Sequence, residues 1–598
     1  MLPAPKLISH RAPELGFTPQ DLLAAGALFH LGAPLAVALA AALLSQGARR
    51  GHTCLAEGEI TARMEAIDAE LAPQLTATGM PWISTQGDPA PLARSCGRLY
   101  LWRHYHHETE LAKRLLHLAQ CRPEVDTAWL AAALPRFFPN LGPEPDFQAL
   151  AALQVVTRQL TIIAGGPGTG KTTTLARALG LYAAHAVHAR GIRPRILLAA
   201  PTGKAAARMR EALASALPAL PPETRGLIPG DACTIHRLLG IGTSGTPQRD
   251  PSRPLAVDLL AVDETSLMDG ELAWHLVRAL PEGARLVLLG DPHQLTSVEE
   301  GAVLASLTGG SPDPEAVGPE TADMAHTLCG WELPALPTPA PPLAENLIAL
   351  RRTYRFRPDS GIQALAQALR TGDTRRLQAV LTQPWPDVTI SPWRTETELA
   401  ALFGRHALPA FKPLGRLSPD AALAAADRLR ILCPMRHGPG GVEHANALLE
   451  TMLRTSSDPW FPGRLILVLA NDPELDLANG DVGVTLRSPG RTLRVWFAGP
   501  RSVPPTALGA VETAYATTVH KSQGSEADTV ILVLPRADHP ILSRELVYTA
   551  ITRARTRLII LGDTERILQA ATRRTERNAG LGERLWHSPQ EDLRQKSV

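Results

Sequence analysis

The stretch GGPGTGKT, residues 165–172, decides the fold class of this chain. The apolar run LTIIA precedes it, and the amphipathic run TTLARALGLYAA follows it. A buried strand, a glycine-rich loop and a helix that begins with Lys-Thr form a cradle whose backbone N–H groups hold phosphates. The pattern GxxxxGK[ST] fits in full, whereas the dinucleotide fingerprint GxGxxG fails because Lys171 stands where its last glycine would be. We predict an ATP site in which Lys171 neutralises phosphate charge and Thr172 binds Mg²⁺, formed by Gly165, Gly166, Pro167, Gly168, Thr169, Gly170, Lys171 and Thr172.

Size and composition limit what surrounds this loop. At 598 residues the chain is too long for one ordinary hydrophobic core, so several domains are expected. The net charge is only +2, which restricts any nucleic-acid site to a local channel. Six scattered cysteines form no CxxC pair, which disfavours disulfides or a zinc site and indicates a reducing, cytoplasmic location. The cluster HYHH at 104–107 lacks a partner motif, so metal binding there is disfavoured.

One apolar segment needs a membrane test. Residues 22–44 are about long enough to span a bilayer, but His30 and Pro34 interrupt them. No basic region and small-residue cleavage site frame a signal peptide. We expect two packed core helices with a break near residues 32–34.

The rest of the chain indicates an α/β fold class. Residues 1–140 are expected to be mainly helical, and a Pro-rich patch then marks a boundary. Over about 146–305, the apolar strands LTIIA, RILLAAP, LLAVDE and RLVLLGD alternate with helical runs, which predicts a parallel sheet with crossover helices. Residues 309–343 are rich in Pro and Gly and are expected to be a surface loop. A second alternating region begins near 346 and resumes around 513–563, where TVILVLP and RLIILGD are predicted strands. The predicted domains are 1–140, 141–345 and 346–598, with a small β insert over about 455–510 in the last.

Two strand ends carry chemistry beside the glycine-rich loop. LLAVDE ends in paired carboxylates, of which Asp263 is predicted to hold Mg²⁺ and Glu264 to orient and deprotonate the attacking water. LLGDPHQL, residues 288–295, places Gln294 where it can hydrogen-bond the γ-phosphate and report its loss. An ordinary turn at the end of a strand is the alternative for this second motif.

Arginines in the second α/β region supply the opposite charge. Phosphoryl transfer builds negative charge, which an arginine from another domain stabilises. TYRF at 353–356 and TAITRARTRL at 549–558 offer Arg355 and Arg553, which we predict form a phosphate clamp. A solvated helix face accounts for Arg555 and Arg557.

Three polar loops are candidates for backbone contacts with a nucleic acid. They are PTGKAAARM (201–209), TIHRLLG (234–240) and TTVHKSQGSE (517–526). Such loops bind phosphates as readily as they cap helices, and capping suffices for any one of them. Together they suggest a strand that crosses both domains, with DNA contacts from Thr202, His236, Thr518, His520 and Lys521. An RNA strand stays open, because backbone contacts do not exclude it.

These motifs, in this order, resemble superfamily 1 helicases of the 5′→3′ branch and, within them, the RecD family, the alpha subunits of bacterial exodeoxyribonuclease V (RecBCD). Segments outside the motifs, such as RLYLWRHYHHE and ILCPMRHGPGGV, share the resemblance. It implies two RecA-like P-loop domains, an SH3-like insert in the second, and a helical N-terminal domain that docks on RecC. It implies ATP- and Mg²⁺-dependent 5′→3′ translocation on single-stranded DNA, with duplex unwinding, in double-strand-break repair alongside RecB and RecC. By position it assigns Gln148 to the adenine, Glu526 to the ribose and Arg553 to the arginine finger.

Departures from the family pattern are small. DETSLMD and DPHQL carry less common residues but keep Asp263, Glu264 and Gln294. No motif identifies the strand-separating pin, for which residues 241–257 are a suggestion. A stand-alone RecD-like helicase and a subunit that uses ATP only as a switch are the alternatives. The N-terminal segments and length favour the complex-bound form, and the retained hydrolytic set disfavours the switch.

Overall fold

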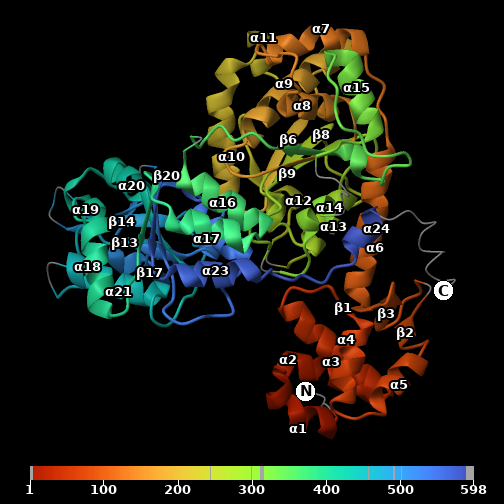
Figure 1. Cartoon of the computed structure of the whole chain (residues 1–598), viewed down its shortest axis with the longest axis horizontal. Helices are drawn as coiled ribbons and strands as arrows, with labels where there is room; N and C mark the ends of the chain where they lie inside the picture. Colours follow the sequence, from red (N-terminus) through yellow and green to blue (C-terminus); the bar gives the residue numbers. More distant parts are fainter. Residues whose placement is uncertain are drawn as a thin grey trace. The chain divides into compact units, whose positions relative to one another are not determined.

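The computed structural model describes residues 5–85, 87–242, 244–297, 299–309, 315–357, 359–454, 457–488, 490, 492–499 and 501–586. The chain divides into two compact units, which we describe separately. Unit 1 consists of residues 1–292, 296–353 and 576–598, and unit 2 of residues 293–295 and 354–575. Helices and strands carry the labels of Figure 1.

The N-terminal part of unit 1 consists of helices and one small sheet. Helix α3 is buried along most of its length, because its alanines allow close packing on the neighbouring helices. The expected break is confirmed: α2 ends at His30 and α3 begins at Leu35. Among the described residues, no helix is long and apolar enough to cross a membrane. The elements are α1 (Lys6–Leu15), α2 (Pro19–His30), α3 (Leu35–Arg49), β1 (Cys54–Ala56), α4 (Glu57–Glu65), α5 (Leu71–Ala77), β2 (Ile83–Ser84), β3 (Leu92–Ser95), β4 (Arg98–Leu101) and α6 (Trp102–Gln120).

The sheet of this region, in the order β1-β4-β3-β2, was not predicted. Its strands are two to four residues long, too short for an alternating pattern to emerge from the sequence. The N-terminal region is therefore mainly helical, as expected, with a sheet at its junction to α6.

The central sheet of unit 1 has six parallel strands in the order β10-β5-β9-β8-β6-β7. Helices cover both faces, so the strands are apolar on both sides. Ile163 packs with α8 and α9, whereas its neighbour Ile162 packs with α6 and α13. The strands are β5 (Leu160–Gly165), β6 (Ile196–Ala200), β7 (Cys233–Thr234), β8 (Leu259–Val262), β9 (Arg285–Gly290) and β10 (Leu347–Leu350).

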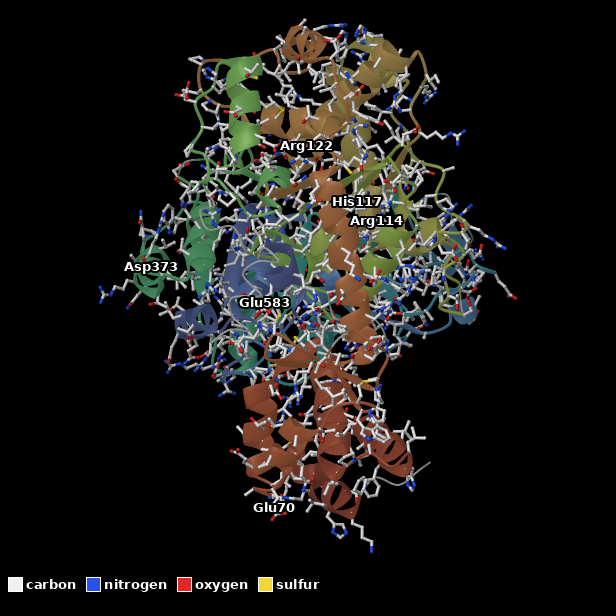
Figure 2. The ribbon with its side chains drawn as sticks, turned by 90° about the vertical axis from the view of Figure 1, so that its right-hand side faces the viewer. Glu70, Arg114, His117, Arg122, Asp373 and Glu583 are labelled. Carbon is white, nitrogen blue, oxygen red and sulfur yellow. The ribbon has the colours of Figure 1, made fainter. Side chains whose placement is uncertain are left out.

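The helices from α9 to α15 connect parallel strands of this sheet, as the alternating pattern predicted, and α6, α7, α8 and α24 pack around it. The longest of them apart from α9 is α6, which carries Arg114 and His117, and Arg122 lies just beyond its C-terminal end (Figure 2). Arg114 and His117 pair with Glu282, and Arg122 pairs with Glu320. The other helices are α7 (Thr127–Phe137), α8 (Phe147–Thr157), α9 (Lys171–Arg190), α10 (Gly203–Ala216), α11 (Pro222–Arg225), α12 (Ile235–Leu239), α13 (Gly270–Arg278), α14 (Val303–Thr308), α15 (Pro319–Cys329) and α24 (Leu581–Trp586).

The expectation of a continuous surface loop over 309–343 is wrong at α15. This helix has a proline in its first turn, Glu320 near its N-terminus and Gly330 in the left-handed conformation at its end. These are ordinary helix start and stop signals, which the surrounding proline-rich composition obscured. Residues 310–314 lie outside the described residues.

Unit 2 has a second parallel sheet, in the order β11-β20-β19-β12-β18. The runs TVILVLP and RLIILGD form β19 and β20, as predicted. The elements are α16 (Gly361–Thr371), α17 (Thr374–Thr382), β11 (Val388–Ser391), α18 (Glu396–His406), α19 (Leu408–Phe411), α20 (Pro419–Asp427), β12 (Leu429–Cys433), α21 (Val442–Leu453), β18 (Ala516–Thr518), β19 (Ala527–Val533), α22 (Arg544–Ile551), β20 (Ala554–Leu561) and α23 (Thr564–Thr572).

The expected small β insert lies between α21 and β18. It is an antiparallel sheet in the order β16-β15-β14-β13-β17 with a core of its own around Ile466, Val495 and Phe497. Its strands are β13 (Leu465–Val468), β14 (Val482–Arg487), β15 (Leu493–Trp496), β16 (Ser502–Val503) and β17 (Val511–Thr513). The fold is thus α/β with two P-loop-type parallel sheets and an antiparallel insert in the second, as expected.

The boundaries of the compact units differ from the domain boundaries predicted from the sequence. Strand β10 pairs with β5 in the first sheet, and the units divide at 353/354. The described C-terminal segment, residues 576–586, belongs to unit 1, on which α24 packs against α6 and α14. The limits 1–140, 141–345 and 346–598 remain predictions.

Candidate active site

The glycine-rich loop connects the C-terminal end of β5 to the N-terminus of α9. Gly168 and Gly170 have φ of 76° and 81°, a left-handed conformation that glycine adopts without strain. The Lys171 ammonium donates to the carbonyl oxygens of Gly165 at 2.6 Å and Gly166 at 3.2 Å. The lysine head is thereby held over the loop, where a phosphate group would meet it.

This loop has the features that a nucleotide phosphate needs. A Cβ on Gly165 would lie 2.6 Å from Thr169 Oγ1, so only glycine fits there. No side chain among the described residues caps the N-terminus of α9, which leaves its first N–H groups directed at a ligand. Thr172 is in the first turn of α9, half-buried, as the Mg²⁺ assignment requires. The residues present therefore fit ATP with Mg²⁺.

The paired carboxylates lie at the same edge of the same sheet. Asp263 follows β8, and its carboxylate accepts from the Glu264 N–H at 2.8 Å. Loss of hydration and the neighbouring Glu264 charge raise the pKa of Asp263, and the positive charge of Lys171 partly offsets them. A divalent cation at this place would favour the ionised form.

Glu264 is held in an unusual backbone conformation. Its φ is +53°, a left-handed value that costs a non-glycine residue on the order of 1–2 kcal/mol. The residue then begins the 3₁₀ turn Thr265–Leu267, which turns the chain sharply at the strand end. This strain is stored at the residue assigned to the attacking water.

Gln148, assigned to the adenine by resemblance, lies against the same loop. It is in the first turn of α8, whose N-terminus Asp146 caps. Its side-chain amide is buried and donates to the Thr169 carbonyl at 3.0 Å. The structure thus brings Gln148, the glycine-rich loop, Asp263 and Glu264 together on unit 1.

Gln294 and Arg553 meet inside unit 2. The Arg553 guanidinium donates to the Gln294 side-chain oxygen, and both residues are buried. Arg553 also donates to the Thr549 and Ser525 carbonyl oxygens at 3.2 and 3.4 Å. The Leu295 N–H donates to Thr549 Oγ1 at 2.9 Å, which fixes the chain next to Gln294. The predicted sensor and the predicted arginine finger are therefore direct partners.

Arg355 and Glu526, assigned to different roles, form an ion pair. Arg355 Nη2 lies 2.8 Å from Glu526 Oε1, and Arg555 pairs with the other carboxylate oxygen at 3.2 Å. The expectation that Arg555 is only a solvated side chain is incomplete, because it shares this carboxylate. Sequence spacing gave no sign of the pair, since residues 355 and 526 are far apart in the chain.

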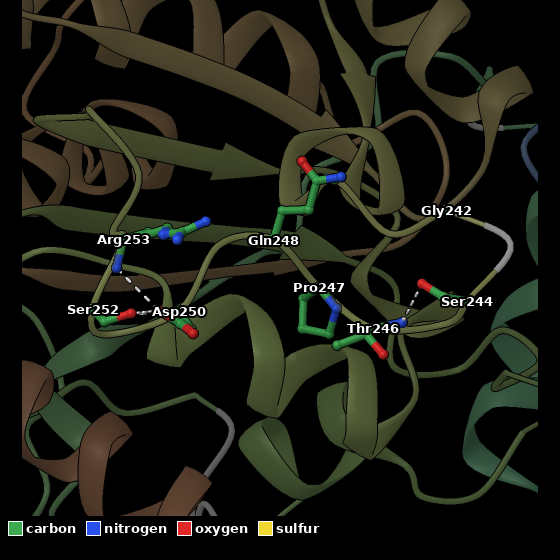
Figure 3. A pocket seen from close by; sticks show the side chains of 9 residues that line it. Gly242, Ser244, Thr246, Pro247, Gln248, Asp250, Ser252 and Arg253 are labelled. Atoms are coloured by element: carbon green, nitrogen blue, oxygen red, sulfur yellow. Dashed lines mark hydrogen bonds between the residues drawn. The ribbon is translucent and has the colours of Figure 1, made fainter.

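The predicted DNA contacts of unit 1 are exposed helix starts. Thr202 caps α10 by accepting from the Ala205 N–H at 3.3 Å, and His236 is exposed on α12. Beyond α12, a polar pocket of about 510 Å³ opens among residues 240–253 (Figure 3). Asp250 orders one wall by accepting from Ser252 Oγ at 2.6 Å and from the Arg253 N–H at 3.0 Å. The pocket lies in the segment suggested for the pin, and that suggestion remains untested.

The predicted DNA contacts of unit 2 surround a short helical turn. Thr518 ends β18 and accepts from the Lys521 N–H at 3.2 Å, with His520 between them. The Lys521 ammonium pairs with Glu512 at 2.7 Å, and Arg436 pairs with the other oxygen of Glu512 at 3.0 Å. The sequence prediction missed Glu512, which lies shortly before the motif, and Arg436, which is distant from it in the chain and gave no local signal.

The HYHH cluster is an aromatic stack. The His107 ring stacks on Trp274, with ring centroids 4.0 Å apart, and Arg278 covers Trp274 at 4.3 Å. Within the described ranges, no group of three His, Cys, Asp or Glu side chains is placed to hold a metal ion. All six cysteines are free thiols.

Two family models and several curated proteins match this chain. The AAA domain model matches residues 148–300, and the UvrD-like helicase C-terminal domain model matches residues 513–561. The chain is 35% identical over 558 residues to the RecBCD enzyme subunit RecD of Mycolicibacterium smegmatis, covering 92% of this chain and 93% of that one. It is 37% identical over 498 residues to the protein of the same name from Mycobacterium tuberculosis, covering 81% and 80%. It is 30% identical over 580 residues to the ATP-dependent RecD2 DNA helicase of Deinococcus radiodurans, covering 92% and 68%.

Proposed function

This chain belongs to the RecD family, and from that premise we propose that it is an ATP-dependent 5′→3′ translocase and helicase on single-stranded DNA. We propose that it works as a motor subunit of a RecBCD-type complex, with RecB and RecC as partners, in the repair of double-strand breaks. A cytoplasmic location goes with this role, and the free thiols support it.

One observation carries the hydrolytic part of the proposal. The Lys171 ammonium, the strained Glu264 and the Asp263 carboxylate, which accepts from the Glu264 N–H, occur together at the C-terminal edge of one parallel sheet. In open α/β sheets, this edge is where ligands bind. A protein that only bound nucleotide as a switch would have no use for a strained carboxylate beside the metal position.

Each residue then has a role in the reaction. Lys171 would hold the β- and γ-phosphates, and Thr172 and Asp263 the Mg²⁺ ion, which neutralises charge on the phosphate oxygens when bound. Glu264 would take the proton of the attacking water. Gln294 would report the γ-phosphate, and Arg553 and Arg355 would stabilise the charge that develops on it. Gln148 and Glu526 are the proposed contacts to the base and the sugar.

The same cycle would drive movement along DNA. Loops on the two units, at Thr202 and His236 and at Thr518, His520 and Lys521, would grip the phosphate backbone with strengths that alternate between nucleotide states. Backbone contacts of this kind are insensitive to sequence and sensitive to salt. We therefore expect DNA affinity to fall steeply as the salt concentration rises.

Strand displacement on tailed duplexes tests the proposal directly. The purified chain, alone and co-expressed with RecB and RecC, is given a duplex with a 5′ or a 3′ single-stranded tail, with ATP and Mg²⁺. We expect unwinding from the 5′ tail only. Unwinding from the 3′ tail would refute the polarity, and absence of DNA-stimulated ATP hydrolysis in both preparations would refute the motor itself. Co-purification with RecB and RecC separates the subunit from a stand-alone helicase.

A further inference from the structure

The loop that follows Gln294 is held on unit 1 by three distant parts of the chain. The Gly301 N–H donates to the Gly51 carbonyl at 3.0 Å, and the Gly270 N–H donates to the Glu300 carbonyl at 3.0 Å. The third contact comes from Arg577, near the C-terminal end. We call Gly51, Gly270 and Arg577 the loop brace.

Arg577 makes the strongest of these contacts. Its guanidinium donates to the Ser297 carbonyl at 2.7 Å and to the Glu299 carbonyl at 3.1 Å. Hydrogen bonds from a charged donor are about twice as strong as neutral ones, and a planar fork that reaches two carbonyls fixes their relative orientation. Burial lowers the pKa of Arg577, but a guanidinium remains charged at neutral pH.

Gly51 and Arg577 fit each other closely. A Cβ on Gly51 would lie 1.1 Å from Arg577 Nη1, so only glycine leaves room for the guanidinium. Gly51 also has a φ of +85°, which suits glycine. The N-terminal region therefore touches the guanidinium and the loop at the same point.

The backbone around Arg577 is fixed to the N-terminal region as well. Asn578 donates its N–H to His52 Nδ1 at 2.9 Å, and its carbonyl accepts from the Thr53 N–H at 2.9 Å. Further along, the Gly580 N–H donates to the Glu108 carboxylate at 3.1 Å. Arg577 is thus anchored on a segment that cannot shift without breaking several hydrogen bonds.

The brace lies where the chain passes from one unit to the other. The chain leaves unit 2 at 295/296 and again at 575/576. Ser297 is two residues after the first of these points, and Arg577 is two residues after the second. Arg577 therefore joins, within unit 1, two segments that directly follow passages of the chain from unit 2, and the first of these passages comes after Leu295, the neighbour of Gln294.

We propose that Arg577 is a positioning residue for ATP hydrolysis: it sets the backbone at Ser297 and Glu299 and thereby the place of Gln294, and it makes turnover respond to the N-terminal region. This inference rests on the proposed function, because Gln294 needs a γ-phosphate to act on. The N-terminal region, through Gly51, holds the other side of the same loop. Force or partner binding on the N-terminal region would therefore change the position of Gln294 through the contact of Gly51 with Arg577 and this loop.

Variants at Arg577 test the first part of the inference. In the full chain, Arg577→Ala is expected to lower the DNA-stimulated kcat about tenfold to a hundredfold, the range that a small misplacement remote from the chemistry produces. The KM for ATP should stay within about twofold, because the phosphate loop is untouched. Arg577→Lys should restore part of the rate, since an ammonium can still donate to these carbonyls. Arg574→Ala, an exposed arginine three residues away, is the control and should behave as wild type.

A pair of glycine variants tests the part played by the N-terminal region. Gly51→Ala pushes against the Arg577 guanidinium, whereas a Cβ on Gly97, at φ +66°, meets nothing within 4 Å. Both substitutions place alanine at a positive φ, which should lower the melting temperature in each case. Gly51→Ala should lower it further, because it also displaces the Arg577 guanidinium. Only Gly51→Ala should lower kcat. A double variant with Arg577→Ala should then be no slower than Arg577→Ala alone, because both act through the same contact.

Three results would overturn the inference. They are a wild-type kcat in Arg577→Ala, equal kcat values in Gly51→Ala and Gly97→Ala, and a rate loss wholly accounted for by a smaller folded fraction in an active-site titration. Absence of DNA-stimulated ATPase activity in the wild-type protein would instead refute the proposed function. The wild-type assay therefore comes before the variants and distinguishes the two failures.

Discussion

The cationic side chains assigned to ATP are held differently in the two units. In unit 1, Lys171 donates to the carbonyl oxygens of Gly165 and Gly166, which are neutral and belong to its own loop. In unit 2, Arg553 donates to the Gln294 amide and Arg355 pairs with the Glu526 carboxylate. A phosphate displaces a neutral carbonyl from a cation more easily than it displaces a carboxylate.

Under the proposed function, this difference means that the unit 1 side chains would already be in place for a nucleotide, whereas the unit 2 side chains would have to exchange partners. Gln294 would give up Arg553, or share it, when a γ-phosphate binds. Arg355 would give up Glu526 only if Glu526 found another partner, for which the ribose hydroxyls are suited. Binding energy spent on these exchanges would be recovered in the transition state, where the arginines matter most.

The largest effect on ATP hydrolysis is expected from a substitution in unit 1. Lys171→Gln should lower DNA-stimulated ATP hydrolysis by about a thousandfold or more, because the phosphates lose their main positive charge in a site that excludes water. Steady-state ATPase assays measure the rate, and circular dichroism checks the fold. Lys113→Gln is the control, because Lys113 is an exposed α6 side chain paired with Glu110. Hydrolysis by Lys171→Gln at the wild-type rate would remove the assignment.

In unit 2, Arg553→Ala should lower kcat and leave the affinity for ATP unchanged. We expect a loss of about a hundredfold or more, since an arginine finger stabilises charge that exists only in the transition state. The measurement is kcat and KM for ATP with saturating single-stranded DNA. Arg557→Ala, which removes an exposed arginine of β20, the strand that follows Arg553, should leave both constants unchanged. An unchanged kcat in Arg553→Ala would make this arginine a structural partner of Gln294 only.

Glu526→Ala decides what the carboxylate does. If it holds the ribose, the KM for ATP should rise about five- to tenfold, the equivalent of one lost hydrogen bond with partial charge. If Glu526 is only the counter-ion of Arg355, the released arginine should instead bind phosphate better and KM should fall. Titration of a fluorescent ATP analogue, in the absence of DNA, separates the two outcomes.

How far the sequence predicted the fold depended on the length of each pattern. The strands β5, β6, β8, β9, β19 and β20 were predicted because buried parallel strands are continuous apolar runs bounded by turn residues. The sheet β1–β4 was missed because its strands are too short for periodicity. The helix α15 was missed because composition was judged over the whole of 309–343, although Pro319 and Gly330 mark its two ends.

For the site, motifs predicted residue types and strand ends, and the structure brings the unit 1 residues together. Pairings across the chain could not be predicted, because nothing in the local sequence relates Arg355 to Glu526, or Gly51 to Arg577. The sequence predicts which residues a loop contains, whereas long-range packing decides which partner each side chain meets before the ligand arrives.

The smallest expected effect separates the units by their response to acid. Burial in the stack on Trp274, with the neighbouring charge of His275, lowers the pKa of His107 to about 3 from its ordinary 6.5. The other groups that lower it are on its own helix: Arg103, His104 and His106. Between these two pKa values the unfolded chain binds a proton that the folded chain refuses. Stability is therefore fully present above pH 6.5 and is lost as the pH falls toward 3.

The melting temperature of unit 1 should accordingly be lower at pH 5 than at pH 7. His107 contributes at most about 1.4 kcal/mol of unfolding free energy per pH unit, and less where water reaches the ring. Scanning calorimetry at several pH values, which resolves more than one transition, measures the loss. His107→Phe keeps the aromatic stack and removes the proton site, so it should flatten the pH dependence. His437→Phe is the matched control, since His437 is an exposed histidine of unit 2 paired with Glu443. An equal acid response in His107→Phe and wild type would place the pH sensitivity on other histidines, such as His104 or His52, whose pKa values burial also lowers.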